Sequence, residues 1–411
     1  MRSSRRLQNK RPKTSINDDD GSEPIPMDLL IEIFLKLPVK SITTCRHVCK
    51  YWAYVLGHPD FTELFLTKSF ARPQILLACR GKNDKDGFVF FFPNQPQNPD
   101  RNSSPIKAYP LTHVPGACDV SRPVHGMVLL RGKGVLKGSK TRVDVSVIYN
   151  PSTGDFLTLP KTKTTKKTRN MSFMWQSYLG YDPITKQYKV LSMAYKKRVY
   201  TYEQKLEECV ESQVLTLGTG KLSWHVVECC ITQFPPKAHS EICINGVLFY
   251  RAEVKDSSGV TMRVVSFDFR SEEFNVMKFT ESFTLADSTA LVNYNGKLGV
   301  LITDDYGPHG RFFTNRSTNF ELWVLKDVVK HEWSKHIYVL PPLWKDAVNG
   351  EYLCFAGIIG TDEIVLLSPS MPYVVYYNIK RKTIIKVKIQ GIVTEFHIFL
   401  NHIENVKLIR A

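Results

Sequence analysis

Short strands and tight turns recur at intervals of about 50 residues in the later part of this chain. Asn-Gly steps lie at Asn245-Gly246, Asn295-Gly296 and Asn349-Gly350, which are 50 and 54 residues apart. Asn-Gly favours the positive φ angles of hairpin turns, and apolar or aromatic runs flank the first two steps. A period near 50 built from short strands is typical of the blades of a β-propeller.

A second repeated unit joins two strands through Asn or Asp and a turn. It occurs at Val147–Phe156, Leu179–Tyr188, Val265–Phe274 and Val375–Ile384. Small polar residues or Pro after Asn or Asp favour a turn, and the flanking aromatic residues suit the faces of a sheet. We therefore predict an all-β domain over residues 74–405, a kelch-like propeller of about six blades. The double glycine of kelch repeats is absent, so a two-sheet sandwich or an irregular β domain is the alternative.

The segment Ile25–Trp52 has a helical pattern instead. Pro26 suits the first position of a helix, and apolar residues then recur at helical spacing until Pro38 ends it. Ser41 can cap a second helix and Pro59 can begin a third. Three short helices of about 45 residues cannot bury so many large apolar side chains among themselves. The segment therefore predicts a docking element for a partner or a neighbouring domain.

This segment resembles the F-box motif in its plant form. The matching residues are Ile25-Pro26, Leu29-Leu30, Glu32-Ile33-Phe34, Leu37-Pro38-Val39-Lys40-Ser41 and Val48-Cys49-Lys50-Tyr51-Trp52. The resemblance implies that residues 23–68 form a three-helix F-box, which binds a Skp-type adaptor and so joins a cullin–RING ubiquitin ligase. The positions expected to make the adaptor-binding module are Pro26, Leu29, Leu30, Ile33, Phe34, Leu37, Pro38, Ile42, Cys45, Val48, Cys49 and Trp52.

The β region resembles the plant F-box-associated interaction domain. Short matches occur in the family's order, among them Tyr149–Thr153, Leu179–Pro183, Ile244–Leu248 and Leu322–Asp327. The resemblance implies a domain that binds a protein substrate for ubiquitination and degradation. The matching residues themselves are expected to be strands and turns, so they identify no substrate-binding residue.

The chain carries a formal net charge of +16, which raises nucleic-acid binding as an alternative function. The positive residues are spread out, however, and solvated surface charge is the simpler interpretation. Residues 1–22 are polar and basic, so we expect a disordered tail, which could also serve nuclear import. No run of about 20 apolar residues could span a membrane, and no secretory signal begins the sequence. We expect a cytoplasmic or nuclear protein, or one present in both.

No catalytic motif stands out. The sequence lacks a phosphate loop, a Gly-x-Gly-x-x-Gly turn, a His-Glu-x-x-His pair and a nucleophile elbow. A non-enzymatic receptor subunit without a cofactor is therefore the prediction, and a propeller enzyme or a glycan-binding propeller is the alternative.

Isolated polar residues have structural interpretations. Cys45, His47 and Cys49 are not followed by a second ligand pair at zinc-like spacing, so no metal site is expected and both cysteines are interpreted as small core residues. His125, His225 and His239 lie near predicted strands without a visible nucleophile, and Asp304-Asp305 is expected to cap a turn.

Overall fold

The computed structural model describes most of the chain after residue 24. The described residues are 25–80, 87–92, 106–107, 110–114, 117–134, 143–163, 173–196, 209–234, 241–257, 259–279, 289–305, 312–348, 350–368, 371–390 and 396–409. The tail predicted for residues 1–22 and the side chain of His239 lie outside these ranges.

Four helices form the N-terminal helical module (residues 27–70). They are α1 (Met27–Phe34), α2 (Val39–Cys45), α3 (Lys50–Gly57) and α4 (Pro59–Phe70). The predicted second helix is divided in two, because the backbone at Cys49 is extended, with φ −156°, and the Cys49 sulfur accepts a hydrogen bond from the Trp52 N–H at 3.4 Å. None of the described helices is long and apolar enough to cross a membrane.

The helix starts depend on prolines more than on side-chain caps. Pro26 immediately precedes α1, and Pro59 is the first residue of α4. Ser41 does not cap α2: Pro38 precedes that helix, and the Ser41 N–H already donates to the Pro38 carbonyl at 2.9 Å. Proline fixes φ near the helical value and lacks the N–H that a helix start leaves unpaired, so it can begin a helix without a side-chain cap.

Six sheets follow, and three of them have the following strands in order from one edge to the other. The first contains β27 (Phe396–His402), β1 (Gln74–Arg80), β2 (Phe88–Phe91) and β4 (Pro110–Val114). The second contains β5 (Ala117–Val120), β6 (Val128–Gly134), β7 (Val143–Tyr149) and β8 (Phe156–Thr158). The third contains β9 (Phe173–Asp182), β10 (Gln187–Lys196), β11 (Cys209–Thr216) and β12 (Trp224–Val227).

The other three sheets are built in the same way. The fourth contains β14 (Glu241–Ile244), β15 (Val247–Asp256), β16 (Gly259–Asp268) and β17 (Glu273–Val276), and β13 (Gln233–Phe234) also pairs with β15. The fifth contains β18 (Ala290–Tyr294), β19 (Lys297–Thr303), β21 (Asn319–Asp327) and β22 (Glu332–Val339). The sixth contains β23 (Leu353–Ile359), β24 (Glu363–Leu367), β25 (Tyr373–Asn378) and β26 (Thr383–Gln390), with β20 (Phe312–Phe313) and β3 (Ile106–Lys107) at its edges, and the short helix α5 (Trp344–Val348) precedes it.

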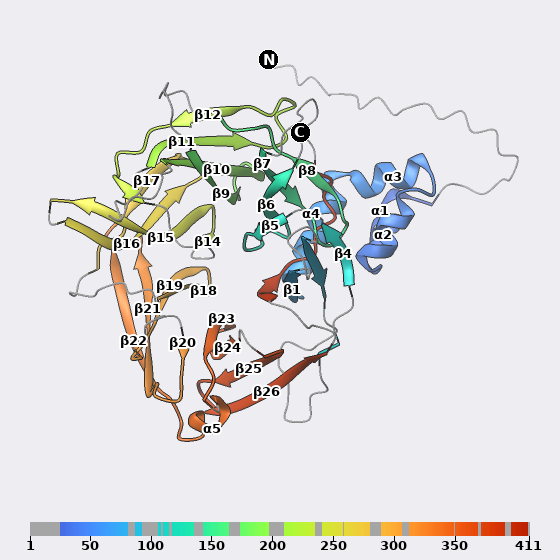
Figure 1. The fold of residues 1–411 in the computed structure, drawn as a ribbon. Helices are drawn as coiled ribbons and strands as arrows, with labels where there is room; N and C mark the ends of the chain where they lie inside the picture. Colours follow the sequence, from blue (N-terminus) through green and yellow to red (C-terminus); the bar gives the residue numbers. More distant parts are fainter. Residues whose placement is uncertain are drawn as a thin grey trace, which may run out of the picture.

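These sheets are the blades of a propeller, as predicted, and the sandwich alternative is wrong. Figure 1 shows them arranged in a ring with the helical module at one side. The first strands of successive blades contact one another: β9 meets β14, β14 meets β18, β18 meets β23, and β23 meets β27. These strands therefore lie closest to the centre of the ring.

The ring is closed by the two ends of the β region. The late strand β27 pairs antiparallel with the first strand β1, with Ile398 opposite Leu77 and Phe396 opposite Cys79. This pairing removes the unpaired innermost edge that an open ring would leave in the first blade. The chain then continues for a few residues to the helical module.

Apolar cores lie between adjacent blades. Tyr178 and Leu191 of the third blade share one cluster with Tyr250 and Phe267 of the fourth. A Cβ at Gly180 would lie 1.9 Å from the ring of Phe269, so only glycine permits this approach of the two blades.

The repeated Asn/Asp units form matching turns. In each, the side-chain oxygen accepts a hydrogen bond from a backbone N–H two or three residues later: Ser152 to Asn150 at 2.9 Å, Ile184 to Asp182 at 2.9 Å, Arg270 to Asp268 at 2.7 Å and Arg381 to Asn378 at 2.9 Å. The side chain thereby imitates a backbone turn, which explains why Asn or Asp recurs at this point.

Two of the three Asn-Gly steps are the predicted hairpin turns. Asn245 and Asn295 have φ angles of 49° and 50°, and they join β14 to β15 and β18 to β19. The third step is not equivalent, because α5 rather than a strand precedes Gly350.

Candidate functional site

The helical module divides the residues predicted for adaptor binding into two groups. Leu30, Phe34 and Ile42 are buried, at 3%, 1% and 0% exposure. Leu37, Cys45 and Trp52 are half-buried and pack against the same core. The exposed members are Pro26, Leu29, Ile33, Pro38, Val48 and Cys49.

Helix α1 shows why the sequence alone could not separate these groups. Leu30 and Phe34 lie four residues apart and form one apolar stripe, which faces the core. Leu29 and Ile33 have the same spacing, yet they remain 52% and 49% exposed. The helix therefore has two apolar faces, and the packing of the module uses only one of them.

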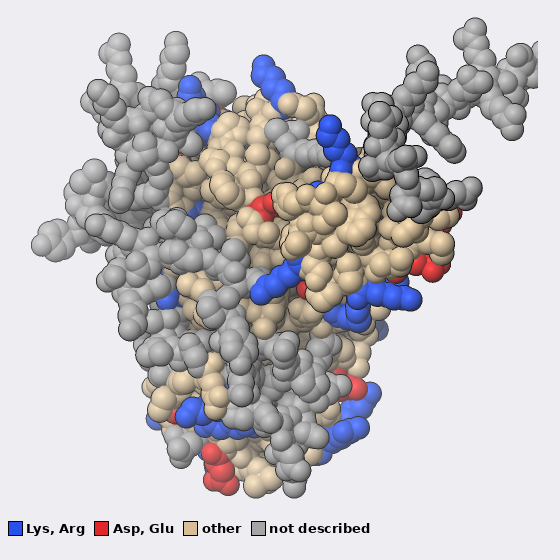
Figure 2. Space-filling model, turned by 90° about the vertical axis from the view of Figure 1, so that its right-hand side faces the viewer, with Lys and Arg blue, Asp and Glu red and all other residues tan. Residues whose placement is uncertain are grey.

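Further exposed apolar side chains lie on the neighbouring segments. Val48, between α2 and α3, is 60% exposed, and Tyr51 and Tyr54 on α3 are also exposed. Trp52 connects α3 to α1, because its ring meets the edge of Phe34 at a centroid distance of 5.1 Å. Figure 2, which views the molecule from the side of the module, shows broad uncharged areas between scattered Lys, Arg, Asp and Glu side chains.

The interpretation of Cys49 as a core residue is wrong, whereas Cys45 does pack against the core. Cys49 is exposed because its extended backbone places it at the start of α3, where its sulfur accepts the Trp52 N–H. Among the residues that the structure describes, no group of three or more His, Cys, Asp or Glu side chains could hold a metal ion.

The core of the module is completed from the far end of the chain. Val406 is fully buried among Phe34, Ile42, Phe61 and other residues of the helices. The guanidinium of Arg46 donates to the carbonyl oxygens of Leu56, at 3.1 Å, and of Val406. We call residues 403–409 the C-terminal strap. Burial lowers the pKa of Arg46, while the nearby Asp155 carboxylate opposes that shift.

Asn405 joins the strap to the propeller. Its side-chain amide donates to the His125 carbonyl at 2.8 Å and to the Tyr188 hydroxyl at 3.0 Å. Its backbone carbonyl accepts from the Asn150 amide at 2.8 Å. Since Asn150 and Tyr188 are buried, these bonds satisfy polar groups that water cannot reach.

One surface ion pair also crosses between the two parts. Lys186 of the third blade lies 2.7 Å from Glu63 of α4, and both side chains are about half exposed. The strap, Asn150 and Arg46 thus hold the module against the propeller at several points. The sequence analysis missed this contact, since Val406 and Asn405 follow the last strand and have no local pattern that indicates it.

The isolated polar residues have structural partners. The His125 ring stacks on Tyr181 at a centroid distance of 4.0 Å, and His225 Nε2 lies 2.7 Å from the Glu272 carboxylate. Asp304 accepts hydrogen bonds from the backbone N–H groups of Thr318 and Asn319. The predicted turn-capping role is thereby confirmed for Asp304.

Comparisons with known proteins match both parts of the chain. The F-box domain matches residues 24–64, and the F-box associated beta propeller domain matches residues 74–409. The "Putative F-box protein At3g23960" of Arabidopsis thaliana is 58% identical over 404 residues, which cover 97% of this chain and 95% of that protein. The Arabidopsis thaliana "F-box protein DOR" is 46% identical over 422 residues, with 100% of both chains covered.

Proposed function

Because the chain belongs to the plant F-box proteins that carry an F-box-associated β-propeller, we propose that it is a substrate receptor of an SCF-type cullin–RING ubiquitin ligase. Residues 23–68 form the unit that binds a Skp-type adaptor, and residues 74–405 form the unit that binds a protein substrate. The protein acts in the cytoplasm, the nucleus or both. Neither matching family is a catalytic domain, which supports a receptor rather than an enzyme.

The exposed apolar face of α1 carries this proposal. Leu29 and Ile33 are about half exposed although Leu30, Phe34 and Ile42 suffice to build the core beneath them. Side chains of this size contribute most to binding when a partner removes them from water. The adaptor therefore contacts Leu29, Ile33 and Val48, whereas the buried residues keep the helices in place.

The contribution to ubiquitination is proximity. A receptor that holds its substrate on the same complex as the ubiquitin-carrying enzyme raises the effective concentration of substrate lysines. Contacts between the C-terminal strap and the module support this function, because they limit the motion of the substrate-binding part relative to the adaptor.

The test compares the two faces of the module in the full chain. We expect Leu29→Ala/Ile33→Ala to weaken binding to a purified Skp-type adaptor at least tenfold, measured by calorimetry, with little change in melting temperature. Leu64→Ala is the matched control, because Leu64 is a similarly exposed leucine on α4 that the F-box motif does not include. Unchanged adaptor affinity in the double variant would show that this face is not the interface.

A further inference from the structure

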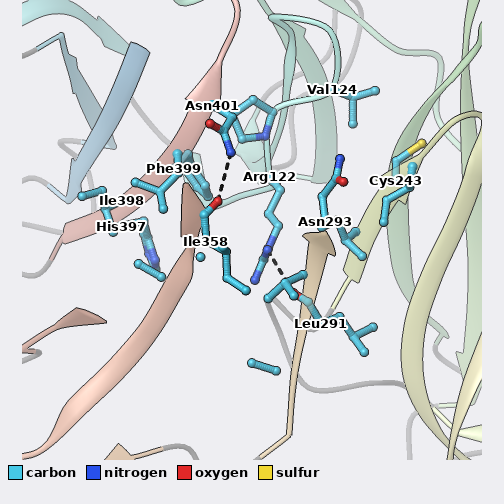
Figure 3. A pocket seen from close by; sticks show the side chains of 18 of the residues that line it. Arg122, Val124, Cys243, Leu291, Asn293, Ile358, His397, Ile398, Phe399 and Asn401 are labelled. Carbon is cyan, nitrogen blue, oxygen red and sulfur yellow. Dashed lines mark hydrogen bonds between the residues drawn. The ribbon is translucent and has the colours of Figure 1, made fainter. Parts of the chain in front are cut away.

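A cavity of about 530 Å³ lies at the centre of the propeller. It is lined by the inner strands β14, β18, β23 and β27 and by the turn that follows β5 (Figure 3). At one end it reaches Phe70, the last residue of α4. Its volume falls within the range of sites that hold small molecules.

The charged lining of this cavity is positive. Arg122 and Arg251 line it, and no Asp or Glu occurs among its described lining residues. Arg122 lies in the middle of the cavity wall in Figure 3, where one guanidinium nitrogen donates to the Leu291 carbonyl at 3.3 Å. A guanidinium has five donors, so this bond leaves capacity for a ligand.

Buried carboxylates beside the cavity offset only part of this charge. Asp119 pairs with Arg131 at 2.5 Å. Glu241 is buried, and burial raises its pKa, although Arg131 and Arg122 counteract the shift. In and beside the cavity, the described residues thus include three guanidinium groups, on Arg122, Arg131 and Arg251, and two carboxylates. An excess positive charge away from water is costly unless an anion compensates it.

The remaining lining combines polar anchors with apolar walls. Asn293 and Asn401 extend beside Arg122, and Asn401 donates to the Ile358 carbonyl at 3.3 Å. The Thr289 hydroxyl lines the cavity and is buried without a hydrogen-bond partner among the described residues. Leu291, Ile358 and Phe399 contribute apolar surface. An ion as small as chloride would leave these walls unoccupied.

We propose that the central cavity is a binding site for a small organic anion, in which Arg122 holds a carboxylate, phosphate or sulfonate group and the apolar walls hold a hydrophobic body. Arginine suits such groups because its planar fork can donate two parallel hydrogen bonds. This site goes beyond the proposed receptor function, and it does not depend on adaptor binding.

The test uses two fluorescent probes of nearly the same shape on the full chain. 8-Anilinonaphthalene-1-sulfonate carries an anionic group, whereas N-phenyl-1-naphthylamine lacks it. We expect the sulfonate to bind at one saturable site per chain, at least tenfold more tightly than the neutral probe. Comparable affinity for both probes, or no saturable site, would overturn the proposal without any variant.

Two variants assign the site. We expect Arg122→Gln to weaken sulfonate binding at least tenfold and to leave binding of the neutral probe unchanged. Ala356→Phe, which fills the cavity from β23, should weaken binding of both probes. Arg270→Gln on an exposed outer turn is the matched control and should change neither affinity. If Arg122→Gln keeps the wild-type affinity for the sulfonate, the proposed role of Arg122 is wrong.

Competition then distinguishes the chemical classes. Naphthoate and naphthyl phosphate are titrated against the bound sulfonate, and the stronger competitor identifies the preferred anionic group. We expect at least one to displace the probe in the wild type, and failure of both would contradict a site for organic anions.

Discussion

The helical module and the propeller bury their apolar side chains in different ways. Each blade of the propeller packs both faces against neighbouring blades, as Tyr178 and Tyr250 do between the third and fourth. In the module, α1 buries Leu30 and Phe34 but leaves Leu29 and Ile33 about half exposed. The propeller is therefore complete by itself at its cores, whereas the module has apolar surface that a partner can cover.

The two regions also differ in how local their stability is. The propeller obtains its packing from a regular repeat, and β27 only closes the ring. The module includes Val406, which follows its own helices by more than 300 residues. This difference implies that changes near the C-terminus affect the helices more than the blades.

Removal of the end of the C-terminal strap should have the largest effect. Deletion of residues 404–411 removes the buried Val406 and leaves Arg46 without one of its carbonyl acceptors. We expect the module to lose roughly 3–6 kcal/mol of stability and with it adaptor binding. The strand signal in circular dichroism should remain, because β27 ends at His402. Deletion of residues 410–411 alone is the control, and equal adaptor affinity in both deletions would refute the dependence on the strap.

Substitution of the two faces of α1 should give the next effect. Phe34→Ala removes a fully buried ring from the module core and should lower the free energy of unfolding by about 3–5 kcal/mol. Ile33→Ala on the exposed face should change it by less than about 1 kcal/mol. Urea unfolding monitored by helical circular dichroism measures both, and similar losses would mean that α1 does not have two distinct faces.

Acid should destabilise the propeller through His402. Burial lowers the pKa of this imidazole to about 3 from 6.5, and its ring nitrogens have no partner among the described residues. Above pH 6.5 it is neutral in both states and contributes nothing. As the pH falls below 6.5, only the unfolded state binds the proton, so the free energy of unfolding drops by roughly 2–3 kcal/mol by pH 4.5.

His402→Gln should remove this contribution, so that its unfolding free energy falls less steeply between pH 6.5 and 4.5. His336→Gln, at an exposed histidine, should keep the wild-type slope. Chemical unfolding at several pH values measures the slope, and identical slopes in the two variants would argue against a role for His402.

The ion pair between the two regions should matter least. Glu63→Gln breaks its contact with Lys186, but both side chains are about half exposed, where water and salt screen the attraction. We expect a loss below about 1 kcal/mol that disappears in 1 M salt. A larger loss in thermal melts would show that this pair, rather than the strap, fixes the module on the propeller.

The sequence was most informative where the fold follows from local repeats. Asn150, Asp182, Asp268 and Asn378 mark equivalent turns because their side chains make the same short-range hydrogen bond in each. Asn349-Gly350 was misinterpreted, because the packing of Trp344 in a core between blades favours a helix before it. Dipeptide signals alone do not contain that long-range contact.

The candidate site shows the same limit. The F-box pattern marked both apolar stripes of α1, but it could not separate Leu29 from Leu30. Cys49 was assigned to the core because it continued the helical spacing, whereas the backbone turns at that residue and exposes it. Which apolar residues remain exposed depends on neighbouring helices, so exposure cannot be derived from spacing within one helix.

By itself, the sequence determined the helical segment, the propeller and the membership in the F-box proteins, because those features depend on periodicity, turn chemistry and short motifs. Only the tertiary structure decided which face of α1 is exposed, that Val406 completes the module core, and that Arg122 and Arg251 line one cavity. These features join residues far apart in the chain. Their positions depend on how the ring closes, since closure by β27 brings the C-terminal strap back to the helices.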